Sequence, residues 1–199
     1  MKEFFLSKYM NIVTNNNPDF SLEKLEKIKY GIEGIYLTIT KLFVVVILGL
    51  ILGIIKDVLI LLLFYNILRF LGFGYHAKTS KECLIFSILF FAFLPFLVIK
   101  NIVIFNYSFL IVFICIINFL LFAPSDTKKR PMFNKKKKLI RKFSLIVITL
   151  VYFMLSLVVS KETSSMILLS IIIQAFMVNP IIYMLTKEPY NNYKVYKKD

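Results

Sequence analysis

The sequence predicts an all-α membrane protein that crosses the bilayer about six times and carries an amphipathic helix before the first crossing. Hydrophobic residues make up 59% of the 199 residues and charged residues only 18%. A soluble domain is about half apolar and about a quarter charged. The apolar residues are also concentrated in blocks, as in multi-pass membrane proteins. We therefore expect one membrane-embedded domain over residues 1–199.

The first part of the chain, residues 1–30, mixes apolar and charged residues. Apolar residues recur there and just beyond at helical spacing, with charged residues on the other face: Leu22, Leu25, Ile28 and Ile32. Asp19 and Ser21 are both candidate N-caps. We expect a helix at the membrane surface, followed by a transmembrane bundle at 36–186 and a tail at 187–199.

Six apolar segments follow, at residues 36–55, 58–72, 84–99, 102–122, 143–160 and 165–186. Only 14 residues lie between Lys41 and Lys56, or ~21 Å of helix against a hydrocarbon core of ~30 Å. The first span must therefore begin before Lys41, whose ammonium can snorkel to the interface. Only the charged pair Lys56–Asp57 separates the first two segments, and no glycine or proline marks a turn between them. A single helix from 42 to 71 is the alternative.

The distribution of positive charge decides between these topologies. With six spans and both termini in the cytoplasm, 22 of the 25 lysines and arginines lie on the inside. This agrees with the positive-inside rule, whereas one merged helix would place residues 69–83 and 123–142 outside. The formal net charge of +14 would suggest nucleic acid in a soluble protein. Here the charge lies beside membrane spans, so we expect contact with the lipid bilayer and no nucleic acid.

Several residues within the spans have a structural interpretation. Gly49 and Gly53 form a GxxxG pattern, which permits close helix packing within the chain or in a possible homodimer. Pro95 and Pro180 are expected to kink their spans, and Gln174 to hydrogen-bond a neighbouring helix. The two cysteines form neither a disulfide framework nor a zinc pattern, and we expect no metal and no cofactor.

The segment from 69 to 87, RFLGFGYHAKTSKECLIFS, brings chemical groups together between two apolar runs. It contains His76, the only histidine, and Cys83. A thiolate is a nucleophile, and an imidazole can take the thiol proton and later pass it to a leaving amine. This pair is the minimum for acyl transfer through a thioester.

The spacing of this pair requires a break in the helix. Residues seven apart in one straight helix lie ~10 Å apart, whereas proton transfer needs ~3 Å. Thr79 and Glu82 form a T-x-x-E capping box that predicts a helix beginning near residue 80, with Cys83 in its first turn. Gly72 and Gly74 provide backbone freedom that lets His76 fold back toward the thiol.

The same residues resemble the signature of the accessory gene regulator protein B (AgrB) family, R-x-x-x-G-G-x-H-A followed by a cysteine. The match here runs from Arg69 through Gly74, His76 and Ala77 to Cys83. A second match is the segment APSDT at 123–127 with KKRP after it, and Tyr30-Gly31 is a third, so that the resemblance covers roughly residues 20–186. One departure is Phe73, which stands where the family has the first glycine of its pair.

This resemblance implies a membrane-embedded cysteine endopeptidase of quorum sensing that acts on an AgrD-like propeptide. It implies that Cys83 attacks the bond that joins the ring-forming segment to an acidic tail, with His76 as base and then acid. The peptide's own cysteine or serine would then close a thiolactone or lactone. The alternative is a non-catalytic membrane transporter or export scaffold for a small peptide, in which Cys83 and His76 are structural.

Other charged residues are candidates for substrate binding. Arg69 can hold the loop, bind a carboxylate or anchor the span at the headgroups. The basic segment after the fourth span can bind anionic lipid or the acidic tail of a substrate, through residues that include Lys129, Arg130, Lys135 and Lys136. The charge count places this segment, the tail and the loop that carries His76 on the cytoplasmic side of the cell membrane.

Overall fold

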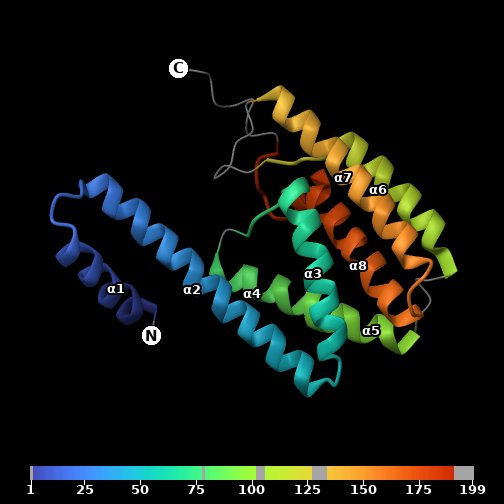
Figure 1. Cartoon of the computed structure of the whole chain (residues 1–199), viewed down its shortest axis with the longest axis horizontal. Helices are drawn as coiled ribbons and strands as arrows, with labels where there is room; N and C mark the ends of the chain where they lie inside the picture. The colour runs from blue at the N-terminus through green and yellow to red at the C-terminus, as the bar shows by residue number, and fades with distance from the viewer. Residues whose placement is uncertain (1, 78, 102–105, 127–133, 191–199) are drawn as a thin grey trace.

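The computed structural model describes residues 2–77, 79–101, 106–126 and 134–190, apart from the side chains of residues 2 and 101. In these ranges the chain is almost entirely helical and forms no strand (Figure 1). The elements are α1 (Lys2–Asn16), α2 (Leu22–Ile51), α3 (Ile55–Gly72), α4 (Ser80–Ile88), the π-helix η1 (Leu89–Phe93), α5 (Leu94–Asn101), α6 (Ser108–Phe122), α7 (Lys135–Ser156), α8 (Lys161–Val178) and α9 (Pro180–Leu185). The prediction of an all-α membrane protein is confirmed.

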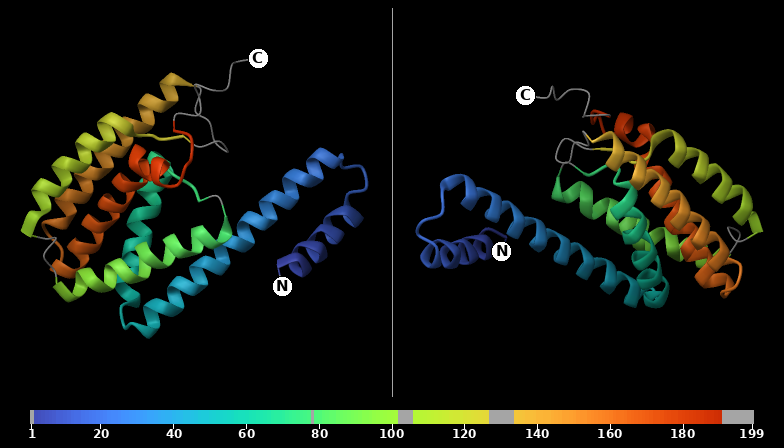
Figure 2. Two further views of the ribbon diagram at one scale, coloured as in Figure 1. Left: turned by 180° about the vertical axis from the view of Figure 1, so that it is seen from behind. Right: turned by 45° about the horizontal axis from the view of Figure 1, so that its top comes forward.

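The N-terminal region differs from the expected arrangement. The amphipathic segment and the first span form one helix, α2, whose N-cap is Ser21 and which runs through Lys41 without interruption. The two elements merge because no proline separates them and because the glycines at 31 and 34 are tolerated in a helix interior. A separate helix, α1, precedes them and packs on α2 through Phe5 and Tyr36, whose rings lie 4.9 Å apart. Figure 2 shows α1 and the first half of α2 projecting away from the remaining helices.

The turn between the first two spans lies at Gly53, not at Lys56–Asp57. Ile54 N donates to Gly49 O and Gly53 N donates to Leu50 O, which is the pattern of a Schellman motif. Gly53 supplies the left-handed residue of this motif, with φ of 70°. Gly49 faces α3, since a Cβ placed there would lie 3.2 Å from Val58. Both glycines of the GxxxG pattern are therefore engaged within the chain, and the merged helix is ruled out.

The prolines act at helix boundaries. Pro95 follows η1, where the Leu94 N–H donates to Leu89 O instead of continuing the α-helical pattern. This π turn accommodates the missing N–H of the proline, so that Ser80–Lys100 stays one stretch long enough to cross a membrane. Pro180 does not kink a span: α8 ends at Val178, and Pro180 is the first residue of α9.

Helix α8 is the centre of the bundle and packs on α3, α6 and α7. Its side chains are buried around most of its circumference, including Ile167, Leu168 and Ile171. Within the described residues, α2, the Ser80–Lys100 stretch, α7 and α8 have the length and composition of membrane spans, and α6 is a shorter apolar helix. Backbone hydrogen bonds bring the C-terminal ends of α3, α6 and α8 together at one end of the bundle (Figure 1). That end holds the candidate site.

Candidate active site

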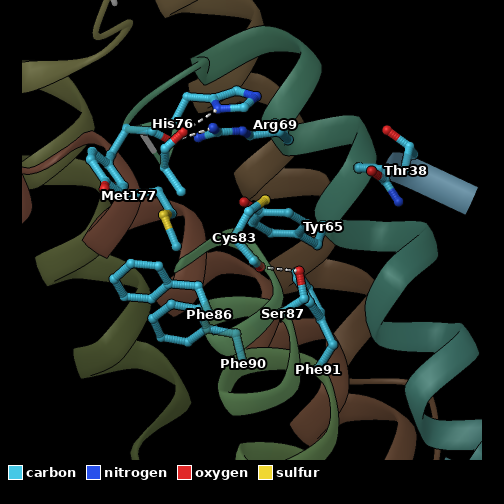
Figure 3. A pocket seen from close by; sticks show the side chains of 13 residues that line it. Thr38, Tyr65, Arg69, His76, Cys83, Phe86, Ser87, Phe90, Phe91 and Met177 are labelled. Carbon is cyan, nitrogen blue, oxygen red and sulfur yellow. Dashed lines mark hydrogen bonds between the residues drawn. The ribbon is translucent and has the colours of Figure 1, made fainter. Parts of the chain in front are cut away.

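A cavity of about 350 Å³ opens beside the loop that follows α3 (Figure 3). Its walls come from α2, α3, the loop, α4, η1 and α8. The residues that line it are Thr38, Tyr65, Asn66, Arg69, Tyr75, His76, Ala77, Cys83, Phe86, Ser87, Phe90, Phe91 and Met177. Figure 3 shows His76 and Arg69 at one end, Cys83 and Tyr65 further in, and the rings of Phe86, Phe90 and Phe91 at the other end. The structure thus brings His76, Cys83 and Arg69 to one cavity.

Cys83 lies in the first turn of α4, as predicted. Thr79 is the N-cap: its hydroxyl accepts a hydrogen bond from Glu82 N at 3.2 Å, and its carbonyl accepts one from Cys83 N at 3.1 Å. The first turn of a helix favours a negative charge, because its N–H groups point outward along the axis. The side chain is half-buried, so that a substrate can reach the thiol.

His76 lies on the loop and is exposed. Its Nδ1 is 3.2 Å from the carbonyl oxygen of Ala77. Since a carbonyl oxygen can only accept, a neutral imidazole that makes this contact carries its proton on Nδ1. That tautomer is the one in which Nε2 can act as a base.

Arg69 holds the loop in place from below. Its guanidinium donates hydrogen bonds to the carbonyl oxygens of Phe73 and Tyr75. Gln174 adds a hydrogen bond from Nε2 to Phe73 O at 3.1 Å, as expected of a polar residue within the last span. Tyr75 N donates to Met177 O at 2.8 Å. The geometry supports the loop-holding interpretation of Arg69 over the headgroup anchor.

The second sequence match lies directly against this loop. Ser125 and Phe73 form a parallel bridge in which Gly74 N donates to Ser125 O at 3.0 Å and Ser125 N donates to Gly72 O at 3.2 Å. The Ser125 hydroxyl donates to Val178 O at 2.6 Å and ties both segments to the end of α8. Two motifs about 50 residues apart therefore form one hydrogen-bonded structure beneath His76.

The loop glycines are required for different reasons. A Cβ at Gly72 would collide with the Gln174 amide. Glycine is therefore required for the close approach of α3 to α8 at this position. Gly74 has φ of 101°, and a Cβ there would lie 2.5 Å from Met177 O and 2.8 Å from the Arg69 guanidinium. Burial raises the pKa of the neighbouring Tyr75, so its phenol stays protonated near neutral pH.

Lys41 is the site residue whose role sequence reasoning missed. Its ammonium, carried by α2, lies 3.0 Å from Cys83 Sγ. The sequence indicated only that this lysine stands within an apolar run, which is typical of an interfacial anchor. No local pattern pairs two residues that are 42 positions apart.

The basic segment is described only in part. Lys129 and Arg130 lie outside the described residues. Lys135 and Lys136 are exposed in the first turn of α7, after the N-cap Asn134. Further along this helix, Arg141 donates to Phe70 O at 2.6 Å and lies 4.4 Å from the ring centre of Phe73. The start of α7 is thus attached to the loop that carries His76.

The arrangement has the chemical groups of nucleophilic acyl transfer. It combines a thiol at a helix N-terminus, an imidazole on the wall of the same cavity, and a cation beside the sulfur.

Comparison with known proteins finds a matching family model and several relatives. The family model described as Accessory gene regulator B matches residues 6–178. An AgrB-like protein of Listeria monocytogenes serovar 1/2a is 31% identical over 173 residues, which cover 86% of this chain and 84% of that protein. An AgrB-like protein of Clostridium acetobutylicum is 30% identical over 97% of this chain and 93% of its own length. The accessory gene regulator protein B of Staphylococcus aureus strain RF122 is 29% identical over 79% of this chain and 83% of its own length. No solved structure matches the chain.

Proposed function

The chain belongs to the accessory gene regulator B family, which is linked to the processing of a quorum-sensing peptide, and from this premise we propose that it is a membrane-embedded cysteine endopeptidase. The observation that carries the proposal is the shared cavity: Cys83 and the only histidine, His76, both line it. Its volume of about 350 Å³ lies within the ~300–1,000 Å³ of small-ligand pockets. A short extended segment of a peptide fits such a site.

The proposed reaction begins with proton transfer from the Cys83 thiol to Nε2 of His76. The thiolate attacks the carbonyl carbon at the end of the ring-forming segment, so that a C–S bond forms and the C–N bond breaks. His76 passes its proton to the departing amine. The C-terminal tail leaves, and the peptide remains attached to Cys83 as a thioester.

Ring closure is the second half of the reaction. A cysteine or serine of the peptide attacks the thioester, His76 takes its proton, and Cys83 leaves as a thiolate. The product is a cyclic thiolactone or lactone. A thioester keeps enough activation for exchange with another thiol, so no cofactor is needed for this step.

The substrate in this proposal is an AgrD-like propeptide with an amphipathic leader and an acidic tail. Lys135 and Lys136 are exposed at the end of the bundle that carries the cavity loop, where their charge complements that tail. Lys129 and Arg130 belong to the same proposal. We place this end of the bundle on the cytoplasmic side of the cell membrane, because most of the basic residues flank it.

The test is co-expression of the chain with its propeptide, followed by mass spectrometry of the released tail and ring. Cys83→Ala and Cys83→Ser are expected to abolish processing, because neither residue supplies a thiolate. His76→Ala is expected to slow it by ~10²–10⁴-fold, the usual contribution of a general acid–base group. Cys115→Ala is the matched control, since Cys115 is buried in α6, away from the cavity, and should process normally.

A transporter or export scaffold is the alternative function. It predicts that both Cys83 variants still yield a processed peptide when another protease is present, and lose only its release from the cell. Processing by both variants, at expression equal to that of the parent, would contradict the peptidase proposal.

A further inference from the structure

The contact between Lys41 and Cys83 goes beyond a pairing of cysteine with histidine. Lys41 Nζ lies 3.0 Å from Cys83 Sγ, and both side chains are half-buried between α2 and α4. We propose that Lys41 is a catalytic residue whose ammonium holds the Cys83 thiolate and stabilises it each time it forms. This inference rests on the proposed peptidase function and assigns a third group to its reaction.

An ammonium group in this position favours the charged form of the sulfur. Lysine carries three N–H donors and no acceptor, so its hydrogen bond to sulfur is strongest when the sulfur is a thiolate. Partial burial strengthens the attraction, because less water screens the two charges. The N-terminus of α4 acts in the same direction on the same atom.

The other charged and titratable groups around the cavity have different positions. Arg69, on α3, donates to the carbonyl oxygens of the loop. Tyr65 of α3 and Tyr75 of the loop contribute phenol side chains to the cavity, and His76 lies on the loop. Glu82 stands next to Cys83 on α4 and opposes a negative charge on the sulfur. Among the charged groups described around the cavity, Lys41 is the cation that the structure places within hydrogen-bond distance of the sulfur.

This assignment gives Lys41 and His76 different roles in the reaction. Lys41 donates a hydrogen bond to the sulfur in both halves of the reaction, and His76 carries the proton that moves in each half. In the first half that proton passes from the thiol through His76 to the departing amine. In the second half a different proton passes from the attacking thiol or hydroxyl to His76, while Cys83 leaves as a thiolate beside Lys41. Lys41 therefore improves Cys83 both as a nucleophile and as a leaving group.

The experiment measures the ionisation of Cys83 directly, without substrate. The full-length Cys115→Ala protein has one thiol, whose alkylation by iodoacetamide is followed against pH in membranes. Lys41→Met keeps the length and apolar stem of the side chain but removes the charge. It should slow alkylation at pH 7 by about tenfold or more and move the pH profile upward. Lys41→Arg should retain most of the parent rate.

A control separates charge from structure. Lys29→Met removes a lysine from the exposed surface of the same helix and should leave the profile unchanged. Far above ~8.5, the ordinary pKa of a cysteine, Lys41→Met and its parent should react at equal rates, because the thiol is then ionised in both. Equal rates at pH 7 overturn the proposal, and so does a difference that persists unchanged at high pH.

The processing assay distinguishes this proposal from the one on which it rests. If Cys83→Ala abolishes processing and Lys41→Met alkylates like the parent, the catalytic role of Lys41 is wrong and the peptidase stands. If Cys83→Ala still processes the propeptide, the peptidase proposal fails, and the role of Lys41 fails with it. Slow alkylation together with slow processing in Lys41→Met supports both.

Discussion

Phe73 is the residue at which this chain departs from the glycine pair of its family. Its backbone has φ of 53°, a region that side chains rarely adopt and glycine adopts freely. The loop therefore bends at this position as it would with a glycine. Unlike a glycine, Phe73 also has a ring, which lies 4.4 Å from the Arg141 guanidinium. This cation–π contact attaches α7 to the loop.

The strain at Phe73 predicts an unusual order of variant stability. Phe73→Gly and Phe73→Ala both lose the contact with Arg141, but only glycine relieves the positive φ. Phe73→Gly should therefore be more stable than Phe73→Ala by ~1 kcal/mol, measured from SDS-induced unfolding followed by circular dichroism.

The same pair of substitutions at Phe70 is the control for this prediction. Phe70 also lies against Arg141, with the guanidinium 5.3 Å from its ring centre, but it belongs to α3. At this helical position Phe70→Ala should be more stable than Phe70→Gly by ~1 kcal/mol, because glycine is unfavourable in a helix. The same order of stability at both positions would contradict strain at Phe73.

At the scale of elements, capping residues decide where the helices begin and end. The hydroxyls of Ser21 and Thr79 accept hydrogen bonds from backbone N–H groups at the starts of α2 and α4, and the second cap fixes Cys83 in a first turn. Gly53 ends α2 and separates it from α3, with which it would otherwise merge. Short local motifs thus determine where these helices begin and end.

The role of Gly53 can be tested against a glycine in the interior of α2. Gly53→Ala should lower the free energy of unfolding by ~1–2 kcal/mol, because its φ of 70° is left-handed. Gly34 lies in the interior of α2, with open space around the methyl group that alanine would add. Gly34→Ala should therefore raise the free energy of unfolding by ~0.5–1 kcal/mol. Unfolding in SDS measures both. A stable Gly53→Ala would contradict the Schellman turn.

At the scale of the whole molecule, the bundle has two chemically different ends. One end carries the cavity loop, the segment at 123–126 and the basic start of α7. The other carries the turn at Gly53 and the connection between α7 and α8. The excess of lysine and arginine at the first end predicts that it faces the cytoplasm.

Cysteine labelling tests this orientation. Lys136→Cys and Lys161→Cys are introduced separately into the Cys83→Ala, Cys115→Ala protein, at exposed positions at opposite ends of the bundle. A membrane-impermeant maleimide should label position 161 in intact cells and position 136 only after lysis. Labelling of position 136 in intact cells would reverse the proposed topology.

Much of this protein follows from local sequence. Patterns made by residues close together in the chain could be recognised. These are the apolar segments, the capping box at Thr79, and the choice of His76 and Cys83 as candidate catalytic residues. The turn lies at Gly53 and not at the charged pair Lys56–Asp57, because the left-handed glycine that ends α2 lies inside the apolar run, where the pattern does not mark it. Contacts over long separations could not be predicted, since periodicity and capping report only on neighbours.

The sequence by itself therefore determined the all-α class, most of the helical segments and the identity of the nucleophile and base as candidates. Only the tertiary structure brought Lys41 to the sulfur of Cys83, Ser125 to the backbone of the loop and Gln174 to Phe73. Packing around α8 decides these contacts, because the helices must meet there to bury their apolar faces. Which polar groups then become neighbours depends on the whole bundle.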